Sequence, residues 1–184
     1  MHTKLIEKEI KYIGSQLAPH WIYKNFKLQG DAIVAFIGEC EVALTEMVDI
    51  EDVINNEPIY SKSMLSFITE QFNVNLVEGV FRQRLLICII KELLEERGIF
   101  VVRNGDDLMI DGRKLSVSIA TKSTTSILIH TGLNILSEGA PVKVSGLTSE
   151  LGITDVKEFA LEVMKRYSEE LEDINLASTK VRGV

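Results

Sequence analysis

Cysteine and proline are scarce in this chain, which has two of the first and three of the second among its 184 residues. Cys40 and Cys88 lie far apart and neither belongs to a CxxC pair, so a zinc site and a disulfide are both weakly supported. We interpret both as small core residues, because free cysteine is usually buried. Since no proline-rich linker or repeat divides the sequence, we expect one domain over residues 1–184.

Long apolar runs and clusters of positive charge are also missing. No run approaches the roughly 18 residues that a membrane-spanning helix needs, and the N-terminal stretch MHTKLIEKEIKYIG is charged where a signal peptide would be apolar. We therefore expect a cytoplasmic protein with no membrane partner. The formal net charge is −7, and binding to a phosphate backbone depends on clustered Lys and Arg, so no nucleic-acid partner is expected.

Several common catalytic motifs are absent as well, namely GxSxG, HExxH, the P-loop and GxGxxG. The sequence therefore gives no motif support to a hydrolase, a zinc peptidase or a common nucleotide-binding loop. Asp49, Glu51 and Asp52 are most simply an exposed acidic loop, with a magnesium site as the alternative, because hard cations prefer oxygen ligands. No metal site is assigned.

The pattern of apolar residues predicts an α+β fold, a mainly antiparallel sheet with helices packed against it. Two helices have clear apolar stripes. The first stripe comprises Val77, Phe81, Leu85, Ile89 and Leu93, with Gly98 as a C-terminal cap. The second comprises Val156, Phe159, Ala160, Val163, Met164, Tyr167, Leu171 and Ile174, with Thr154 or Asp155 as the N-terminal cap. The other expected elements are strands at 8–16 and 30–44, a helix at 18–26, a short helix or loop at 47–58 and an ambiguous segment at 61–72.

The stretch DDLMIDGRKLSVSIATKSTTSILIHTGLNI, residues 106–135, is predicted to form two hairpins. Asp111-Gly112 has the sequence of a two-residue turn, which sets the register of the first hairpin. The second hairpin has the looser tip KSTTS, and there we choose the register that pairs aliphatic with aliphatic residues. The expected pairs are Met109–Lys114, Ile110–Arg113, Ile119–Ile129, Val117–Thr131 and Leu115–Leu133.

This register places polar and small residues together on one face of the sheet. They are Asp107, Lys114, Ser116, Ser118, His130, Gly132 and Asn134. Because small residues leave room above a sheet, we predict a ligand pocket centred on Lys114, with an ordinary solvated face as the alternative. The opposite face is predicted to be core, and comprises Leu108, Ile110, Leu115, Val117, Ile119, Ile127, Ile129 and Leu133.

Other residues have functional and structural interpretations that the sequence leaves open. Gln16, His20 and Trp21 could contact a ligand, or form a loop in which Trp21 anchors the core. His130 is a candidate general base, since histidine titrates near neutral pH, or a polar group satisfied by Ser118 or a carboxylate.

The residues around Lys114 resemble the catalytic segment of biotin protein ligases and lipoate ligases. Asp106-Asp107 resembles the Asn-Asp pair of that family, and GRKLSV, which begins at Gly112 and includes Arg113, resembles its lysine motif. The resemblance implies that Lys114 contacts a substrate carboxylate and the phosphate of an acyl-adenylate. It also implies that Asp106 and Asp107 border a nucleotide or metal site, with ATP and Mg²⁺ as cofactors.

A second resemblance covers the whole chain. The segments GSQLAPHW, GDAIVAFIGECEV and MVDIEDV, with DDL and GRKLSVSIAT, resemble an uncharacterised prokaryotic family, domain of unknown function three-six-six. That family belongs to the class II synthetase and biotin ligase fold group, which implies the fold and a homodimer but no activity. The Gly/Arg-rich loop that closes over the adenylate in the ligases does not occur here.

Three functions follow from these patterns. The first is an acyl-adenylating ligase or acyltransferase, with Lys114 and His130 as catalytic residues and Ser116 and Ser118 orienting a small carboxylate or nucleotide-linked ligand. The second is a non-catalytic small-molecule-binding protein that has lost the adenylation loop. The third is an interaction role, with a partner chain covering the polar face.

Overall fold

The computed structural model describes residues 1–138 and 142–184 and contains two sheets. The larger has five strands in the order β1-β2-β3-β8-β7, and the smaller has three in the order β4-β5-β6. Only β1 runs parallel to its neighbour in these sheets; the other pairs are antiparallel. The strands are β1 His2–Leu5, β2 Ala32–Val42, β3 Ile59–Phe72, β4 Val102–Asn104, β5 Asp107–Ile110, β6 Arg113–Lys114, β7 Ser116–Lys122 and β8 Ser126–Asn134.

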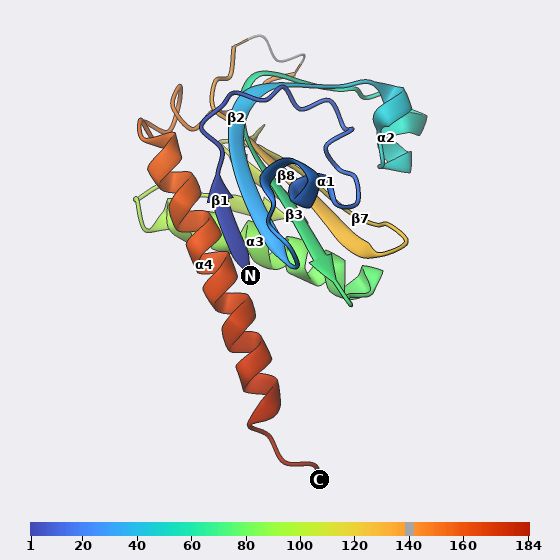
Figure 1. The fold of residues 1–184 in the computed structure, drawn as a ribbon. Coiled ribbons are helices and arrows are strands. Elements are labelled where there is room, and N and C mark those ends of the chain that lie inside the picture. The colour runs from blue at the N-terminus through green and yellow to red at the C-terminus, as the bar shows by residue number, and fades with distance from the viewer. Residues whose placement is uncertain (139–141) are drawn as a thin grey trace.

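Helices cover both faces of the larger sheet (Figure 1). The helices are α1 Trp21–Phe26, the 3₁₀ turn η1 Leu44–Glu46, α2 Ile50–Asn55, α3 Leu76–Glu95 and α4 Val156–Thr179. α3 and α4 pack on one face through the main apolar core, which includes Phe67, Leu86 and Tyr167. α1 and the N-terminal segment pack on the other face through a second core around Phe36 and Met64. This confirms the predicted α+β architecture.

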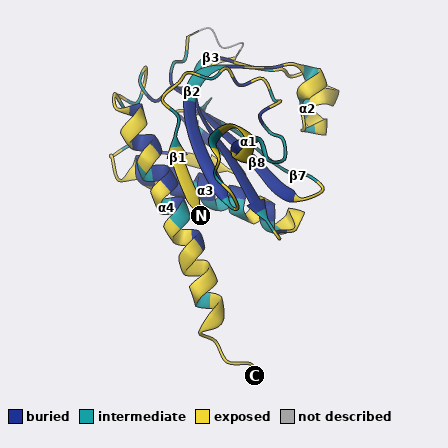
Figure 2. Ribbon diagram, in the orientation of Figure 1, coloured by how far each residue is buried: buried dark blue, intermediate teal, exposed yellow. Residues whose placement is uncertain are grey.

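The two long helices were predicted with different success. In α4 the stripe is confirmed from Val156 to Leu171, and Asp155 accepts a hydrogen bond from the backbone N–H of Glu158 as the cap. Ile174 is half exposed, because the end of α4 projects beyond the sheet (Figure 2). In α3 the predicted stripe is wrong at its start, since Val77 and Phe81 are exposed. The face towards the sheet instead includes Gly79, Gln83, Leu86, Ile87, Ile90 and Leu94.

The first predicted strand, at 8–16, is also wrong. In this stretch Tyr12 makes a single bridge to Cys40, while the N-terminal strand β1 lies earlier in the chain. The segment crosses β2 closely at Gly38, where a Cβ atom would lie 2.2 Å from the carbonyl oxygen of Ile10. A glycine is therefore required for the N-terminal segment to reach the sheet at this point. The ambiguous segment at 61–72 belongs to β3.

The register of the first hairpin is as predicted, but that of the second is shifted by one residue. Met109 pairs with Lys114 and Ile110 with Arg113, across a turn in which Asp111 and Gly112 both have positive φ. Between β7 and β8, the pairs are Ile119–His130, Val117–Gly132 and Ser116–Leu133. Val117 and Ile119 therefore lie on the same face as His130, and Ser116 and Ser118 on the opposite face, which contradicts the predicted division of the two faces.

Helix α3 explains the shift. The hydroxyl of Ser118 accepts a hydrogen bond from Gln83 of α3 and also bonds Thr131 of β8, with distances of 3.0 and 2.9 Å. The hydroxyl of Ser116 accepts from the backbone N–H of Leu108 at 2.8 Å. The hydroxyls of Ser116 and Ser118 are thus satisfied by hydrogen bonds within the fold.

Candidate functional site

A cavity of about 580 Å³ lies on the face of the sheet opposite α3 and α4, within the range of small-molecule pockets. Its walls come from the N-terminal segment, the end of β2, η1, α2, β3, the β5–β6 hairpin, β7, β8 and the segment at 142–144. The apolar part of the lining includes Leu17, Val42, Met47, Ile59, Met64 and Val144. The cavity is thus a pocket lined by both apolar and polar side chains.

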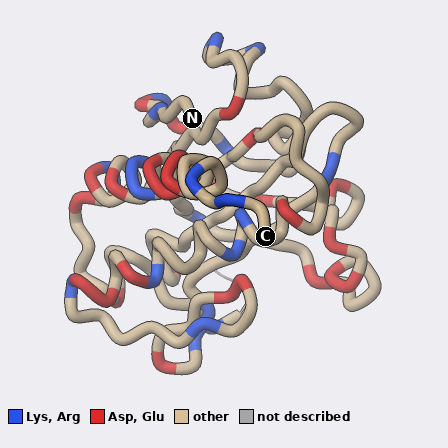
Figure 3. Tube along the Cα trace, turned by 90° about the horizontal axis from the view of Figure 1, so that it is seen from below, with Lys and Arg blue, Asp and Glu red and all other residues tan. Residues whose placement is uncertain are grey.

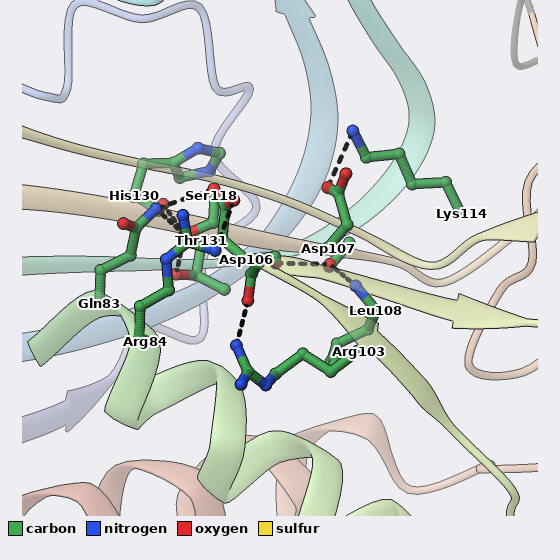
Figure 4. Close-up of polar contacts among 12 residues, drawn as sticks. Gln83, Arg84, Arg103, Asp106, Asp107, Leu108, Lys114, Ser118, His130 and Thr131 are labelled. Atoms are coloured by element: carbon green, nitrogen blue, oxygen red, sulfur yellow. Dashed lines mark hydrogen bonds and ion pairs between the residues drawn. The ribbon is translucent and has the colours of Figure 1, made fainter. Parts of the chain in front are cut away.

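Lys114 and Asp107 stand together at the edge of the cavity. They lie on adjacent strands of the β5–β6 hairpin, and the ammonium of Lys114 is 2.9 Å from a carboxylate oxygen of Asp107 (Figure 4). The side chains are 42% and 33% exposed, respectively, so the pair meets solvent and cavity rather than the core. Because an ammonium has three N–H donors, Lys114 can bind Asp107 and a ligand oxygen at once.

Asp106 lies behind this pair and is tied to helix α3. Its carboxylate accepts a hydrogen bond from Gln83 at 3.0 Å and lies 2.9 Å from the guanidinium of Arg84 (Figure 4). Burial and the charge of Asp107 raise the pKa of Asp106, while Arg84 acts in the opposite direction. The contacts with α3 fix the start of the hairpin, which in turn positions Asp107 and Lys114.

The floor of the cavity is aromatic. The imidazole of His130 stacks on the ring of Tyr12 with 3.8 Å between ring centroids, and its Nε2 lies 3.3 Å from the hydroxyl of Ser66. Burial lowers the pKa of His130 to about 3, so the ring is uncharged at neutral pH. A base with so low a pKa is poorly matched to proton abstraction near pH 7.

The cavity brings together most, but not all, of the residues that the sequence singled out. Those that line it are Asp106, Asp107, Lys114, Ser116, Ser118, His130 and Asn134. Those outside the lining are Gln16, His20, Trp21, Arg113 and Gly132. Asn134 is 5% exposed, and in the part of the chain that the structure describes its side-chain amide has no hydrogen-bond partner.

Four of the five residues outside the lining make structural contacts. The Gln16 amide accepts from the N–H of Ile13 and donates to the carbonyl of Lys11, so it holds its own loop. His20 occupies the N-cap of α1, where its backbone N–H donates to Glu70. Two others are explained by packing. Trp21 packs in the second core, and a Cβ on Gly132 would lie 2.3 Å from the sulfur of Met64.

One wall of the cavity was not predicted as part of the Lys114 site, although Asp49 and Asp52 were considered as an exposed loop or a magnesium site. Four carboxylates in and around η1 and α2 line it, namely Glu46, Asp49, Asp52 and Glu57. The sequence TEMVDIEDVINNE shows the density of acids, but their position over the sheet depends on contacts distant in sequence. Figure 3 shows acidic residues gathered on the right, where α2 lies.

Two negative findings concern the described residues. Within residues 1–138 and 142–184, no group of three or more His, Cys, Asp or Glu side chains is arranged to hold a metal ion. Among the helices described, none has the length and apolar character required to cross a bilayer.

Comparison with known proteins places the chain in a family. The model for "Domain of unknown function (DUF366)" matches residues 1–182. Uncharacterized protein MJ0805 of Methanocaldococcus jannaschii is 38% identical over 180 residues, which are 95% of this chain and 81% of that protein. The solved structure of a protein of unknown function from Pyrococcus horikoshi has a TM-score of 0.94 and 43% identity, over 100% of this chain and 98% of that chain.

More distant solved structures share the fold at low sequence identity. Ta0514, a putative lipoate protein ligase from T. acidophilum with bound lipoic acid, has a TM-score of 0.62 and 13% identity, over 94% of this chain and 86% of that one. Lipoate-protein ligase A bound with ATP has a TM-score of 0.61 and 14% identity over the same shares. A biotin protein ligase from Aquifex aeolicus in complex with biotin has a TM-score of 0.61 and 18% identity, over 94% and 70%. The chain therefore belongs to the DUF366 family and has the fold of the lipoate and biotin protein ligases.

Proposed function

We propose that this chain binds a small molecule with a carboxylate group in the cavity beside Lys114. The observation that carries the proposal is that Lys114 is the one cationic side chain among the described residues that line the cavity. Asp107 holds its ammonium at the wall. Bonds from an ammonium to a carboxylate are among the stronger hydrogen bonds in proteins, roughly 1.5–3 kcal/mol.

The rest of the lining supports this proposal. The apolar walls formed by Leu17, Met47 and Val144 suit the hydrocarbon part of such a ligand. The likeness to chains solved with lipoic acid or biotin agrees with the binding of a small carboxylic acid. Binding is favoured over acid–base catalysis, because His130 is uncharged and stacked on Tyr12.

Acyl-adenylation is a second candidate, in which the carboxylate of an acid bound at Lys114 attacks the α-phosphate of ATP and pyrophosphate leaves; it is favoured by the likeness to lipoate-protein ligase A bound with ATP. If it occurs, pyrophosphate is released when the protein is incubated with ATP, Mg²⁺ and lipoate or hexanoate. The binding function predicts that these acids raise the melting temperature without pyrophosphate release.

Replacing Lys114 by Met tests the role of the ammonium directly. We expect Lys114→Met to weaken the binding of hexanoate and lipoate by about ten-fold or more, because the charge-assisted bond is lost while the aliphatic stem remains. Isothermal titration calorimetry measures the change.

Lys122→Met is the matched control, since Lys122 is exposed on β7 and does not line the cavity. It is expected to bind both acids as the unmodified chain does. Equal affinity in the Lys114→Met and unmodified proteins would contradict the proposal. Native mass spectrometry of the freshly purified protein complements the titration by giving the mass of any retained ligand.

A further inference from the structure

The walls of the cavity carry far more negative than positive charge. Six carboxylates line it, those of Glu46, Asp49, Asp52, Glu57, Asp106 and Asp107, and among the described residues Lys114 is the one cation in the lining. His130 adds no charge at neutral pH. The field inside the cavity is therefore negative, which disfavours a polyanion such as a free nucleotide and favours a cation.

The carboxylates on the two sides of the cavity differ in their partners. Asp107 is paired with Lys114, and Asp106 with Arg84. By contrast, no ion pair joins Glu46, Asp52 or Glu57 to another described residue. The unneutralised charge is thus concentrated on the α2 side, opposite the β5–β6 hairpin.

The carboxyl group of Asp52 is affected by the other carboxylates on the α2 side. Burial, followed by the charge of Asp49, raises the pKa of the Asp52 carboxyl, and Lys114 partly offsets the rise. Lys114 on the hairpin and Asp52 on α2 both line the cavity, from two different walls. A ligand between them would meet an ammonium on one side and a carboxylate on the other.

Asn134 is an independent sign that the cavity holds a ligand. Its side chain is among the cavity-lining groups of β8 and is more than nine-tenths buried, yet its amide is unpaired within the described part of the chain. Polar side chains that are largely buried normally have a hydrogen-bond partner. A polar ligand group in the cavity would supply the missing hydrogen bond.

We propose that the natural ligand carries a positively charged amine in addition to its acidic group, with the amine against Asp52 on the α2 wall and the carboxylate at Lys114. This inference rests on the proposed carboxylate-binding function and names its substrate class, a small amino acid-like zwitterion. An organic amine is favoured over a bare metal ion, since the described side chains provide no cluster suited to a metal.

Three probes of equal chain length test the inference: hexanoate, ω-aminohexanoate and hexylamine. We expect ω-aminohexanoate to bind about ten-fold more tightly than hexanoate, since a second charge-assisted contact is added. The Asp52→Asn variant is expected to lose most of this difference. Calorimetric titrations at low ionic strength give the affinities, and thermal melts show that each variant is folded.

Glu51→Gln is the matched control. Glu51 neighbours Asp52 on α2 and carries the same charge, but its side chain does not line the cavity. The control is expected to bind ω-aminohexanoate as the unmodified chain does. An equal loss in both variants would mean that the overall negative charge, rather than a contact with Asp52, attracts the amine, and would overturn the inference.

The outcomes separate this inference from the proposed function. If hexanoate binds as tightly as ω-aminohexanoate and its binding depends on Lys114, the proposed function stands and the inference of an amine group in the ligand is wrong. If the amines bind through Asp52 without dependence on Lys114, the amine site stands and the carboxylate role of Lys114 is wrong. If none of the probes binds, both are overturned. Binding of Mg²⁺ alone that displaces hexylamine and requires Asp52 would overturn the amine in favour of a metal.

Discussion

Between about pH 6.5 and pH 4, the protein is expected to lose roughly 3 kcal/mol of folding free energy through His130 alone. The unfolded chain binds a proton on this residue below about pH 6.5, whereas the folded chain does so only near pH 3. Over this range the unfolded state therefore binds more protons, and stability falls as the pH falls, by about 1.4 kcal/mol per pH unit. The contribution is fully present above pH 6.5.

His130→Phe isolates this effect, because phenylalanine can stack on Tyr12 and does not titrate. Urea unfolding of both proteins at a series of pH values gives the two stability profiles. Carboxylates contribute to both profiles, so the difference between them reports His130. The variant loses the contact with Ser66 and starts from lower stability, but its profile should be flatter by about 1.4 kcal/mol per pH unit. Parallel profiles would show that His130 titrates normally in the folded state.

Gly38→Ala is expected to destabilise the fold by about 3 kcal/mol, near the upper end of the range for overpacking. The added Cβ would lie 2.2 Å from the carbonyl oxygen of Ile10, and backbone cannot move aside as a flexible side chain can. The N-terminal segment would have to leave β2, to which the N–H of Ile10 donates a hydrogen bond at Ile37. Tyr12, two residues further on, would be displaced from the cavity floor.

Chemical denaturation measures this change, and loss of the near-ultraviolet circular dichroism of the aromatic side chains would report the displacement of Tyr12. Gly183→Ala is the control, since nothing lies within 4 Å of a Cβ at that position. It is expected to unfold at the same denaturant concentration as the unmodified chain. A Gly38→Ala protein of unchanged stability would mean that the N-terminal segment does not cross β2 as described.

The two hairpins show how far the sequence determines local structure. The turn at Asp111-Gly112 contains its own register signal, because both residues adopt positive φ in a two-residue loop. The register between β7 and β8 depends on α3, whose Gln83 bonds the hydroxyl of Ser118. The choice of register from aliphatic pairs did not take contacts with that helix into account. The predicted register is therefore shifted by one residue.

The candidate site, like the hairpins, was predictable where local sequence determines it and not where it depends on contacts distant in sequence. Lys114, Asp107 and Asn134 were found because they lie on strands whose alternation can be read directly. The orientation of α3 was misjudged, since aliphatic residues surround the helix and Leu85, Leu86 and Ile87 support several stripes. The acidic wall was interpreted as an exposed loop, because only the folded chain brings α2 over the cavity.

The C-terminal part of α4, which projects beyond the sheet, is expected to unfold locally more easily than the part that packs on the sheet. Leu171 is the last of its buried residues, and the turns that follow have little tertiary contact to hold them. Short helical segments without packing fray in water. Amide hydrogens beyond Leu171 should consequently exchange with deuterium far sooner than those near Val163, so that the two ends of a continuous helix report local and global opening separately.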